Sequence, residues 1–346
     1  MRLNGPACPG GAAGPVRFDG TGRLRLPQTG IPGQGPNGGP GNRFRTAVLW
    51  LNIRPMSNDD SLRRAIPPPT PHDVTENVRR ALSEDMGTGD LTAALIGAQT
   101  PAAARVISRE PAVLCGVPWF EEVFRQLDAQ VRVSWSVADG DRVEPGQILC
   151  RLHGRARPLL SGERTALNFL QLLSGTATLT RRYVDAVAGT GVRILDTRKT
   201  IPGLRSAQKY AVRCGGGSNH RMGLYDAVLI KENHIYAAGS ISAAVHNAPT
   251  LSPPGTPVEI EVETLEQLRE ALAAGAQRLL LDNFDVAALC AAVRETGDRA
   301  RLEASGGVTL QTVRAIAETG VDEVSVGSLT KSPQSIDLSM RFDALP

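Results

Sequence analysis

The sequence lacks the short motifs that would by themselves assign a nucleotide, metal or hydrolase site. It has no GxxxxGK[ST] phosphate loop, no GxGxxG opening a strand–helix unit and no GxSxG nucleophile turn. Its five histidines form no HExxH pair, which argues against a zinc site. No apolar run reaches the roughly 18 residues that cross a membrane, and the N-terminus lacks the layout of a signal peptide. We therefore expect no membrane partner.

Cysteine and net charge are also sparse. The five cysteines are odd in number, widely scattered and without a CxxC pair, which predicts reduced thiols and a cytoplasmic protein. A net charge of +3 over 346 residues gives no support to nucleic-acid binding. A chain of this length suggests about two domains.

The first segment has the composition of a disordered extension. Residues 1–42 contain 12 glycines and 7 prolines, too little apolar surface to offset the entropy of ordering. We expect residues 1–55 to be disordered, and Met56 is an alternative start of the chain. Peptides detected upstream of Met56 in natively expressed protein would contradict that alternative.

The folded part is expected to begin near Thr70. The spacing of apolar residues predicts a helix over 70–87 and, after several short β-branched runs, a helix over 161–180 capped by Ser161. From Val192 onward, apolar strands alternate with amphipathic helices, which indicates parallel strand–helix units. The run VEIEVE places three glutamates at alternate positions, so we expect acids in the interior or at the mouth of a barrel.

Residues 196–234 hold most of the chemistry. They contain His220, the glycine turn 215–217 and seven cations: Arg198, Lys199, Arg205, Lys209, Arg213, Arg221 and Lys231. Fixed cations beside inward-turned backbone amides suit a small polyanion with several carboxylates or phosphates. The alternative is a solvated basic loop; we prefer the pocket because strand-like runs tie both ends into a core. His220 is either a ligand contact, which we favour, or a core histidine.

Polar groups recur at the ends of the later strands, where α/β barrels gather their active groups. Glu261 and Asp282 are acids suited to a divalent metal or to sugar hydroxyls, and the alternative for each is a salt bridge with a neighbouring lysine. The turns Ser305–Gly306–Gly307 and Gly327–Ser328 are expected to hold a phosphate on backbone amides. Taken together, these strand ends predict a ring compound with carboxylates meeting a phosphorylated sugar.

With these residues in view, the sequence resembles the quinolinate phosphoribosyltransferases. The resemblance covers about residues 70–346 and rests on EDMGTGDLT, ERTALNFLQ, DTRKTIPGLRSAQKYAVRCGGGSNHRMGLYD, LIKENH, EIEVE, LLLDN, EASGGV and VSVGSLTKS. It implies an open N-terminal α/β sandwich domain (56–176, completed by 328–346) and a seven-stranded α/β barrel (177–327). It also implies transfer of phosphoribose from phosphoribosyl pyrophosphate to quinolinate with loss of CO₂ and with Mg²⁺, in a cytoplasmic homodimer that makes nicotinate mononucleotide for NAD biosynthesis.

The resemblance also distributes the roles. Catalytic roles fall to four residues: Lys199, Lys231, Glu261 and Asp282. The diacid is contacted by Arg198, His220 and Arg221, and by Arg164 reaching across from the other subunit. Lys199 and Lys231 match lysines at the phosphoribosyl donor and the reacting ring, and Thr197 also binds substrate. The 5′-phosphate is contacted by the residues of the two glycine turns, Ser305, Gly306, Gly307, Gly327 and Ser328, and Lys331 can meet a phosphate. Glu261 and Asp282 lie near the ribose hydroxyls and Mg²⁺, directly or through other groups. Arg164 on its own would be read as a surface cation.

Two rival hypotheses remain at this point. One is a related phosphoribosyltransferase that uses another pyridine, such as the homologues of molybdenum operons. The other is a non-catalytic barrel that senses a phosphorylated metabolite, against which the two acids beside the cations argue.

Overall fold

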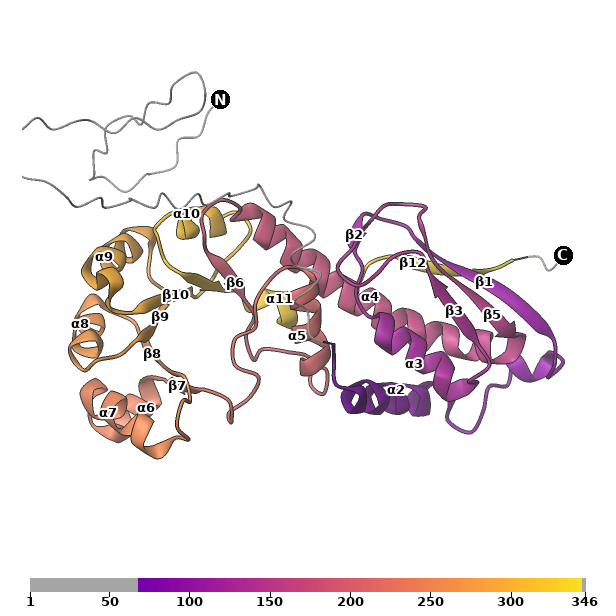
Figure 1. The fold of residues 1–346 in the computed structure, drawn as a ribbon, viewed down its shortest axis with the longest axis horizontal. Helices are drawn as coiled ribbons and strands as arrows, with labels where there is room; N and C mark the ends of the chain where they lie inside the picture. Colours follow the sequence, from indigo (N-terminus) through magenta and orange to yellow (C-terminus); the bar gives the residue numbers. More distant parts are fainter. Residues whose placement is uncertain (1–67, 344–346) are drawn as a thin grey trace, which may run out of the picture.

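The computed structural model describes residues 68–343, which form two units joined by one long helix (Figure 1). The extension predicted to be disordered and the alternative start at Met56 lie outside the described residues. No helix in the described range is long and apolar enough to cross a membrane.

The first unit is a four-stranded antiparallel sheet covered by helices. Its sheet order is β12-β1-β5-β3, with a separate two-stranded pair, β2-β4. Trp119, Phe120 and Phe124 of the covering helix α3 are fully or almost fully buried and pack into the core of this unit. Its elements are α2 (Pro71–Met86), η1 (Ala93–Leu95), β1 (Pro101–Ser108), β2 (Ala112–Val113), α3 (Val117–Leu127), β3 (Arg132–Trp135), β4 (Arg142–Val143), β5 (Ile148–Arg155), α4 (Ala156–Ala186) and β12 (Leu338–Phe342).

Helix α2 confirms the predicted helix to within a residue at each end. Thr70 is its N-cap and accepts a hydrogen bond from the Asp73 amide, and Gly87 follows its last residue. The predicted cap Ser161 is wrong, because α4 begins at Ala156, directly after β5. Ser161 lies inside the helix, and its hydroxyl donates to Asp90 at 2.8 Å.

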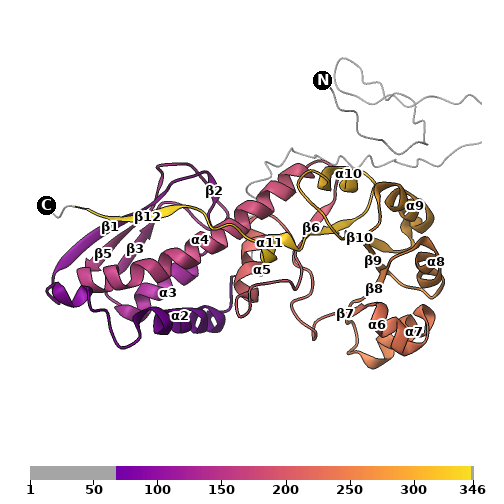
Figure 2. The same cartoon turned by 180° about the vertical axis from the view of Figure 1, so that it is seen from behind.

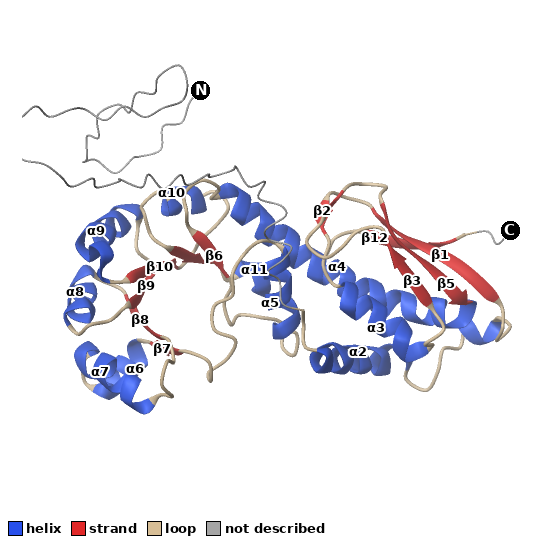
Figure 3. Cartoon of the chain, in the orientation of Figure 1, coloured by secondary structure: helices blue, strands red, loops and turns tan. Residues whose placement is uncertain are grey.

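The second unit is a parallel sheet curved into a barrel, with helices on its outside (Figure 3). Its strand order is β6-β11-β10-β9-β8-β7. The elements are β6 (Arg193–Leu195), α5 (Arg205–Cys214), β7 (Val228–Ile230), α6 (Glu232–Ala238), α7 (Ile241–Leu251), β8 (Val258–Val262), α8 (Leu265–Ala273), β9 (Arg278–Asp282), α9 (Val286–Thr296), η2 (Gly297–Arg299), β10 (Arg301–Ser305), α10 (Val313–Ala317), β11 (Glu323–Ser325) and α11 (Ser328–Lys331). The predicted mixed α/β architecture is confirmed.

The barrel has six strands in the described residues rather than the seven that we expected. The segment after α5 joins β6 through a single parallel bridge, Leu195 to Ser218, and then runs on as a loop to β7. Strands β6 and β7 are therefore the two edge strands of the sheet. The loop of residues 215–227, which we call the cation-rich loop, connects α5 to β7 between these two strands (Figure 1).

The end of the chain returns to the first unit. Strand β12 pairs antiparallel with β1, with Leu338 opposite Ser108, and Figure 2 shows it running from the barrel back to the first sheet. The returning chain crosses α4 closely at Gly175, where a Cβ would come within 2.0 Å of the Gln334 carbonyl oxygen. Only glycine fits there. The last strand of the chain therefore belongs to the sheet of the first unit. Our domain limits remain a prediction.

Candidate active site

A fully buried ion pair anchors the cation-rich loop to the barrel. The Lys209 ammonium on α5 bonds to the carboxylate of Asp196, the residue that follows β6, and both side chains are completely buried. The same carboxylate accepts from the Asn219 amide and from the His220 backbone N–H, at 2.9 Å for His220. Lys209 also donates to the His220 carbonyl at 2.9 Å. Asp196 and Lys209 thus fix the backbone of the loop from two sides.

Three cations of the segment, Lys209, Arg205 and Arg213, lie on α5 and contact other parts of the segment. Lys209 forms the ion pair with Asp196. Arg205 donates hydrogen bonds to the Thr200 hydroxyl and to the Met222 carbonyl. The guanidinium of Arg213 lies 5.9 Å from the centre of the Tyr210 ring. These three cations, which are not among the predicted site residues, contribute to the structure of the segment.

Arg198 and Arg221 are the pair that the structure leaves for an anion. The Nε atom of Arg198 is buried and has no hydrogen-bond partner within the described chain. Burial lowers the pKa of Arg221, and the charge of nearby Arg198 lowers it further. Two close cations with an unmet donor attract an anion with more than one negative group. Arg221 also donates to the Ala227 carbonyl at 3.1 Å, which holds its side chain in place.

Lys199 lies against the last of the predicted glycine turns, Gly327–Ser328. Its side-chain Cδ would be 3.3 Å from a Cβ at Gly327, and the Thr197 hydroxyl lies 3.8 Å from the same position. Thr197 accepts from the Lys199 amide at 3.1 Å. Three predicted residues from two distant segments are therefore neighbours, because parallel β6 and β11 end side by side.

Asp282 and the first glycine turn also meet. Asp282 and Ser305 are opposite one another in the β9–β10 register, and the Asn283 N–H donates to the Ser305 carbonyl at 2.9 Å. Gly306 has φ 97°, and a Cβ there would overlap the Asn283 side chain at 2.1 Å. Gly306 must therefore be glycine. Gly307 is exposed beside it.

The two predicted metal-binding acids differ in their partners. Glu261 forms an ion pair with Lys231, as the salt-bridge alternative held. Asp282 accepts only from the Asn283 side-chain amide, at 2.8 Å, among the described residues. Strands β8 and β9 are adjacent and parallel, with Glu261 paired to Leu280. Glu261 and Asp282 therefore both lie near the carboxyl ends of these strands.

His220 has protein partners at both ring nitrogens. Its Nδ1 accepts from the Arg221 backbone N–H at 2.7 Å, and its Nε2 lies 2.9 Å from Glu259 and 3.5 Å from Glu303. Burial would lower the pKa of His220, but the hydrogen bond to Glu259 and the charges of both glutamates raise it overall. The core-histidine reading thus describes its contacts here, and Glu259 and Glu303 are site residues that our sequence prediction missed.

Of the two remaining predicted residues, Arg164 lies apart from this group and Lys331 lies next to the Gly327–Ser328 turn. Arg164 is exposed on the part of α4 that belongs to the first unit: a Cβ at Gly162 would touch Phe124, and Thr165 bonds to Asp85 at 3.3 Å. Arg164 makes no hydrogen bond or ion pair with any described residue. Lys331 is exposed at the last residue of α11, one turn from Gly327, whose carbonyl accepts from the Lys331 backbone N–H at 3.1 Å.

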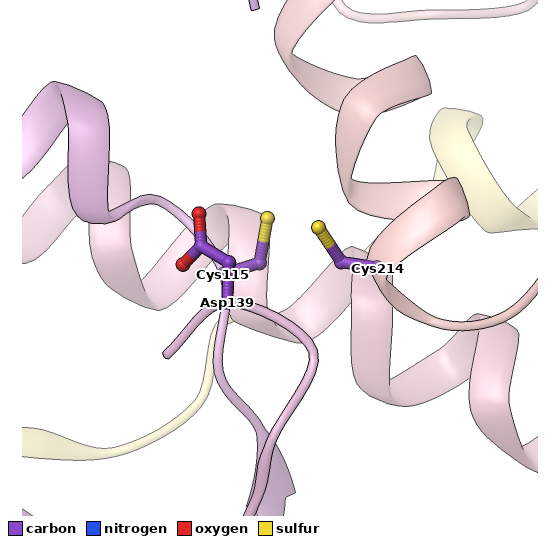
Figure 4. Close-up of side chains that lie close together, drawn as sticks. All are labelled: Cys115, Asp139 and Cys214. Atoms are coloured by element: carbon purple, nitrogen blue, oxygen red, sulfur yellow. The ribbon is translucent and has the colours of Figure 1, made fainter. Parts of the chain in front are cut away.

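A second cluster lies where α5 packs against the first unit (Figure 4). Cys115 and Cys214 point their sulfurs toward each other, and Asp139 lies beside them. Asp139 accepts from the backbone amides of Gly116 and Val117 and from the Tyr210 hydroxyl at 2.9 Å. Burial raises the pKa of the Cys115 thiol, so it stays neutral and unreactive. This cluster joins the two units rather than serving the strand ends.

An α/β barrel with cations, acids and glycine turns at its strand ends belongs to the class of barrel proteins that bind phosphorylated small molecules. The models of the quinolinate phosphoribosyl transferase N-terminal and C-terminal domains match residues 90–174 and 176–341. The chain belongs to the quinolinate phosphoribosyl transferase family.

Named relatives agree with this assignment. The chain is 44% identical over 257 residues to a probable nicotinate-nucleotide pyrophosphorylase [carboxylating] of Bacillus subtilis, covering 74% of this chain and 89% of the relative. It is 45% identical over 274 residues to the nicotinate-nucleotide pyrophosphorylase [carboxylating] of Mycobacterium leprae, covering 77% and 95%. The solved nicotinate-nucleotide pyrophosphorylase of Francisella tularensis is 45% identical, with a TM-score of 0.77, covering 80% of this chain and 99% of that one.

Proposed function

We propose that this protein transfers phosphoribose from 5-phosphoribosyl 1-pyrophosphate to quinolinate and releases nicotinate mononucleotide, pyrophosphate and CO₂. Membership of the family gives the reaction class. The observation that carries the substrate is the pair Arg198 and Arg221, which leaves a buried donor unmet and two cations close together. A pyridine with two adjacent carboxylates supplies the matching charges. The product class is a precursor of NAD.

The arginines and lysines divide the work in this proposal. Arg198 and Arg221 hold the two ring carboxylates by bidentate bonds and so present the ring nitrogen to the sugar carbon. When the bond from that carbon to pyrophosphate breaks, the sugar becomes cationic and the departing pyrophosphate gains charge. Lys199, beside the turn at Gly327, and Lys231 stabilise that charge.

Decarboxylation follows from the first step. Attack by the ring nitrogen forms the bond to the sugar and leaves the nitrogen positive. The adjacent carboxylate then departs as CO₂, its bonding electrons stay on the ring carbon, and a proton from water completes the product. The arginines keep the leaving carboxylate at the orientation this step needs, a positioning effect that is worth several kcal/mol.

The two acids fit Mg²⁺. Carboxylate oxygens are its preferred ligands, and the ion commonly uses one or two of them together with substrate phosphates. Within residues 68–343, Asp282 has only an amide donor as partner, whereas Glu261 would have to share its oxygens with Lys231. Bound there with the donor, the ion would neutralise charge on the departing pyrophosphate. The glycine turns at Ser305–Gly307 and Gly327–Ser328 would hold the sugar 5′-phosphate.

A homodimer with shared sites is part of the proposal. Arg164 is exposed and makes no hydrogen bond or ion pair with any described residue. The segment after α2, which is tied to α4 by the hydrogen bond from Ser161 to Asp90, exposes Leu91 (88%) and Leu95 (86%). On the barrel side, the cation-rich loop and α6 expose large apolar side chains: Leu224, Tyr225 and Tyr236. Exposed apolar groups on both units suit contact between two copies. We also expect a cytoplasmic location, since Cys115, Cys150 and Cys214 are buried free thiols.

One assay tests the function. Purified protein with quinolinate, phosphoribosyl pyrophosphate and Mg²⁺ should form nicotinate mononucleotide and release one CO₂ per product. Nicotinate in place of quinolinate should react poorly, because it lacks the second carboxylate for the arginine pair. Equal use of nicotinate would favour the related phosphoribosyltransferase, and binding without CO₂ release would favour the sensor barrel.

Subunit mixing tests the shared site. Arg164→Ala and Lys199→Ala homodimers should each be nearly inactive. When subunits exchange, a mixed dimer has one site with both native residues, so activity should return to about a quarter of wild type, because half of the dimers are mixed and each has one intact site. Exchange shown by mass spectrometry without any recovery would contradict sharing.

A further inference from the structure

One asparagine after β9 joins an acid of the candidate site to a glycine turn. Asn283 directly follows Asp282, the last residue of β9, and lies against the turn Ser305–Gly307. In the proposed reaction Asp282 meets Mg²⁺ and the turn meets the sugar 5′-phosphate, so both would contact one phosphoribosyl donor. Asn283 itself takes no part in that reaction.

The backbone of Asn283 has a left-handed conformation. Its φ is 58°, and within residues 68–343 it is the one residue other than glycine with a positive φ. Most side chains avoid this region, and asparagine tolerates it better than most. Successive side chains of an extended strand point to opposite faces. The left-handed turn ends that alternation, so the Asn283 side chain comes back to the side of the Asp282 carboxylate.

Three contacts tie Asn283 to its neighbours. Its side-chain amide donates to Asp282 Oδ2 at 2.8 Å, and its backbone N–H donates to the Ser305 carbonyl at 2.9 Å. Its side-chain Oδ1 lies so close to Gly306 that a Cβ at that glycine would overlap it. One residue therefore holds the acid at the end of β9 against the turn that follows β10.

The amide bond determines how Asp282 presents its carboxylate. Oδ2 is engaged by Asn283, whereas Oδ1 accepts no hydrogen bond from any residue in the range 68–343. The amide is neutral, so it leaves the charge of the carboxylate available to a cation. Glu261 differs, because its carboxylate is paired with the Lys231 ammonium.

Packing does not fix this arrangement. Asn283, Gly306 and Gly307 are exposed, and Asp282 is half-buried. The terminal torsion of an aspartate side chain has no narrow preference, so the Asp282 carboxylate would rotate without a hydrogen-bond partner. Groups that hold a ligating carboxylate in one orientation contribute to the affinity of a metal site.

We propose that Asn283 is a positioning residue for the phosphoribosyl donor: its amide orients the Asp282 carboxylate, and its backbone fixes that carboxylate relative to the turn Ser305–Gly307. The proposal rests on the function proposed above, since the donor and Mg²⁺ are the ligands concerned. It assigns Asn283 no contact with substrate. Because the carboxylates of the diacid are assigned to Arg198 and Arg221, loss of Asn283 should weaken binding of the donor and not of quinolinate.

Two variants separate the amide from the backbone conformation. Asn283→Gly removes the amide but adopts a positive φ freely, whereas Asn283→Ala also strains the backbone and should be less stable to urea. The KM for phosphoribosyl pyrophosphate should rise about tenfold in both, the lower end of the effect of removing a group that holds a metal ligand. The KM for quinolinate should not change. Asn247→Ala, exposed on α7, is the control.

Calorimetry measures donor binding without turnover. Full-length protein is titrated with phosphoribosyl pyrophosphate and Mg²⁺, with and without benzene-1,2-dicarboxylate, a diacid that lacks the ring nitrogen and cannot react. The Kd of the donor should rise about tenfold in both Asn283 variants and stay at the wild-type value in Asn247→Ala. An asparagine that served only the backbone turn would leave Asn283→Gly at the wild-type Kd and impair Asn283→Ala alone.

Each outcome decides between the inference and the function on which it rests. Unchanged donor affinity in Asn283→Gly, with product still formed from quinolinate, would overturn the inference and leave the function standing. Donor binding that depends on Asn283, in a protein that makes no product from quinolinate, would do the reverse. Wild-type protein that does not bind the donor would refute both.

The two KM values also test the inference against general damage to the site. If the KM for quinolinate rose as much as the KM for the donor, Asn283 would support the strand ends as a whole and the positioning role would be wrong. If Asn283→Ala does not fold, Asn283→Gly still decides the question, since it keeps the backbone conformation.

Discussion

Replacing Lys209 by methionine tests whether a buried charge pair organises the anion pocket. Lys209 and Asp196 are both fully buried, and together they hold the backbone of His220 by its N–H and its carbonyl. Burial is the largest influence on each: it raises the pKa of Asp196 and lowers the pKa of Lys209. Since burial opposes both charges, the pair adds little net stability, and we infer that it is kept for the position it gives the loop.

The magnitudes follow from that balance. Lys209→Met leaves a buried carboxylate without its cation, and breaking such a pair costs about 3–5 kcal/mol of unfolding free energy. Adding Asp196→Asn removes the stranded charge, so the double variant should regain most of that loss. Its KM for quinolinate should nevertheless stay about tenfold raised, a change of about 1.4 kcal/mol, because no ammonium then holds the His220 carbonyl.

Urea unfolding and steady-state kinetics on the same samples measure both effects. The control is Arg269→Met, which breaks the exposed pair with Glu295 and should change stability little, because solvent screens that pair. If Lys209→Met lost no more stability than this control, the claim that Lys209 neutralises a buried charge on Asp196 would be wrong. If the double variant recovered both stability and affinity, the pair would have no positioning role.

Three further predictions concern the pocket, pH and metal. Arg198→Ala and Arg221→Ala should each lower kcat/KM for quinolinate at least a hundredfold while sedimentation of the protein stays unchanged; either variant near wild type would refute the pocket. The pKa of Glu303 is raised in the folded state from 4.5 to about 8, so the folded state binds the extra proton and unfolding free energy should fall with rising pH across that window, by about 1.4 kcal/mol per unit. Urea titrations should show Glu303→Gln lacking this slope, and an equal slope in both would contradict the assignment. Removal of divalent ions by EDTA should abolish product formation and Mg²⁺ should restore it; undiminished activity in EDTA would argue against a metal at Glu261 and Asp282.

Local sequence patterns predicted the elements well where they depend on neighbours along the chain. The alternation of strands and helices expected from Val192 onward is observed, and α2 was bounded correctly by Thr70 and Gly87. The start of α4 was missed because β5 leads into it without a turn, with Pro158 in the first helical turn, where its missing N–H costs nothing. Local capping patterns cannot show that a strand continues directly into a helix.

Local patterns are also unable to show which cations of residues 196–234 are structural and which can bind a ligand. Lys209 and Arg198 are both basic residues of one segment, and nothing local distinguishes them. Lys209 lies on the buried face of α5, where Asp196 neutralises it, whereas Arg198 follows a strand end and keeps a donor unmet. Depth in the barrel decides which cation is structural and which can meet a ligand, and depth is a property of the tertiary fold.

Strand β8 shows how one simple pattern gives three different chemical roles. Alternation sends Glu259, Glu261 and Glu263 to the same side of the strand, about 6.6 Å apart at each step. Glu259 is buried and fixes His220, Glu261 is half-buried and pairs with Lys231, and Glu263 is exposed. The predicted period was sufficient to place Glu259 and Glu261 on the interior side, whereas Glu263 lies just beyond the last residue of β8. The environments of the three acids differ because each step along the strand adds solvent and changes the partner.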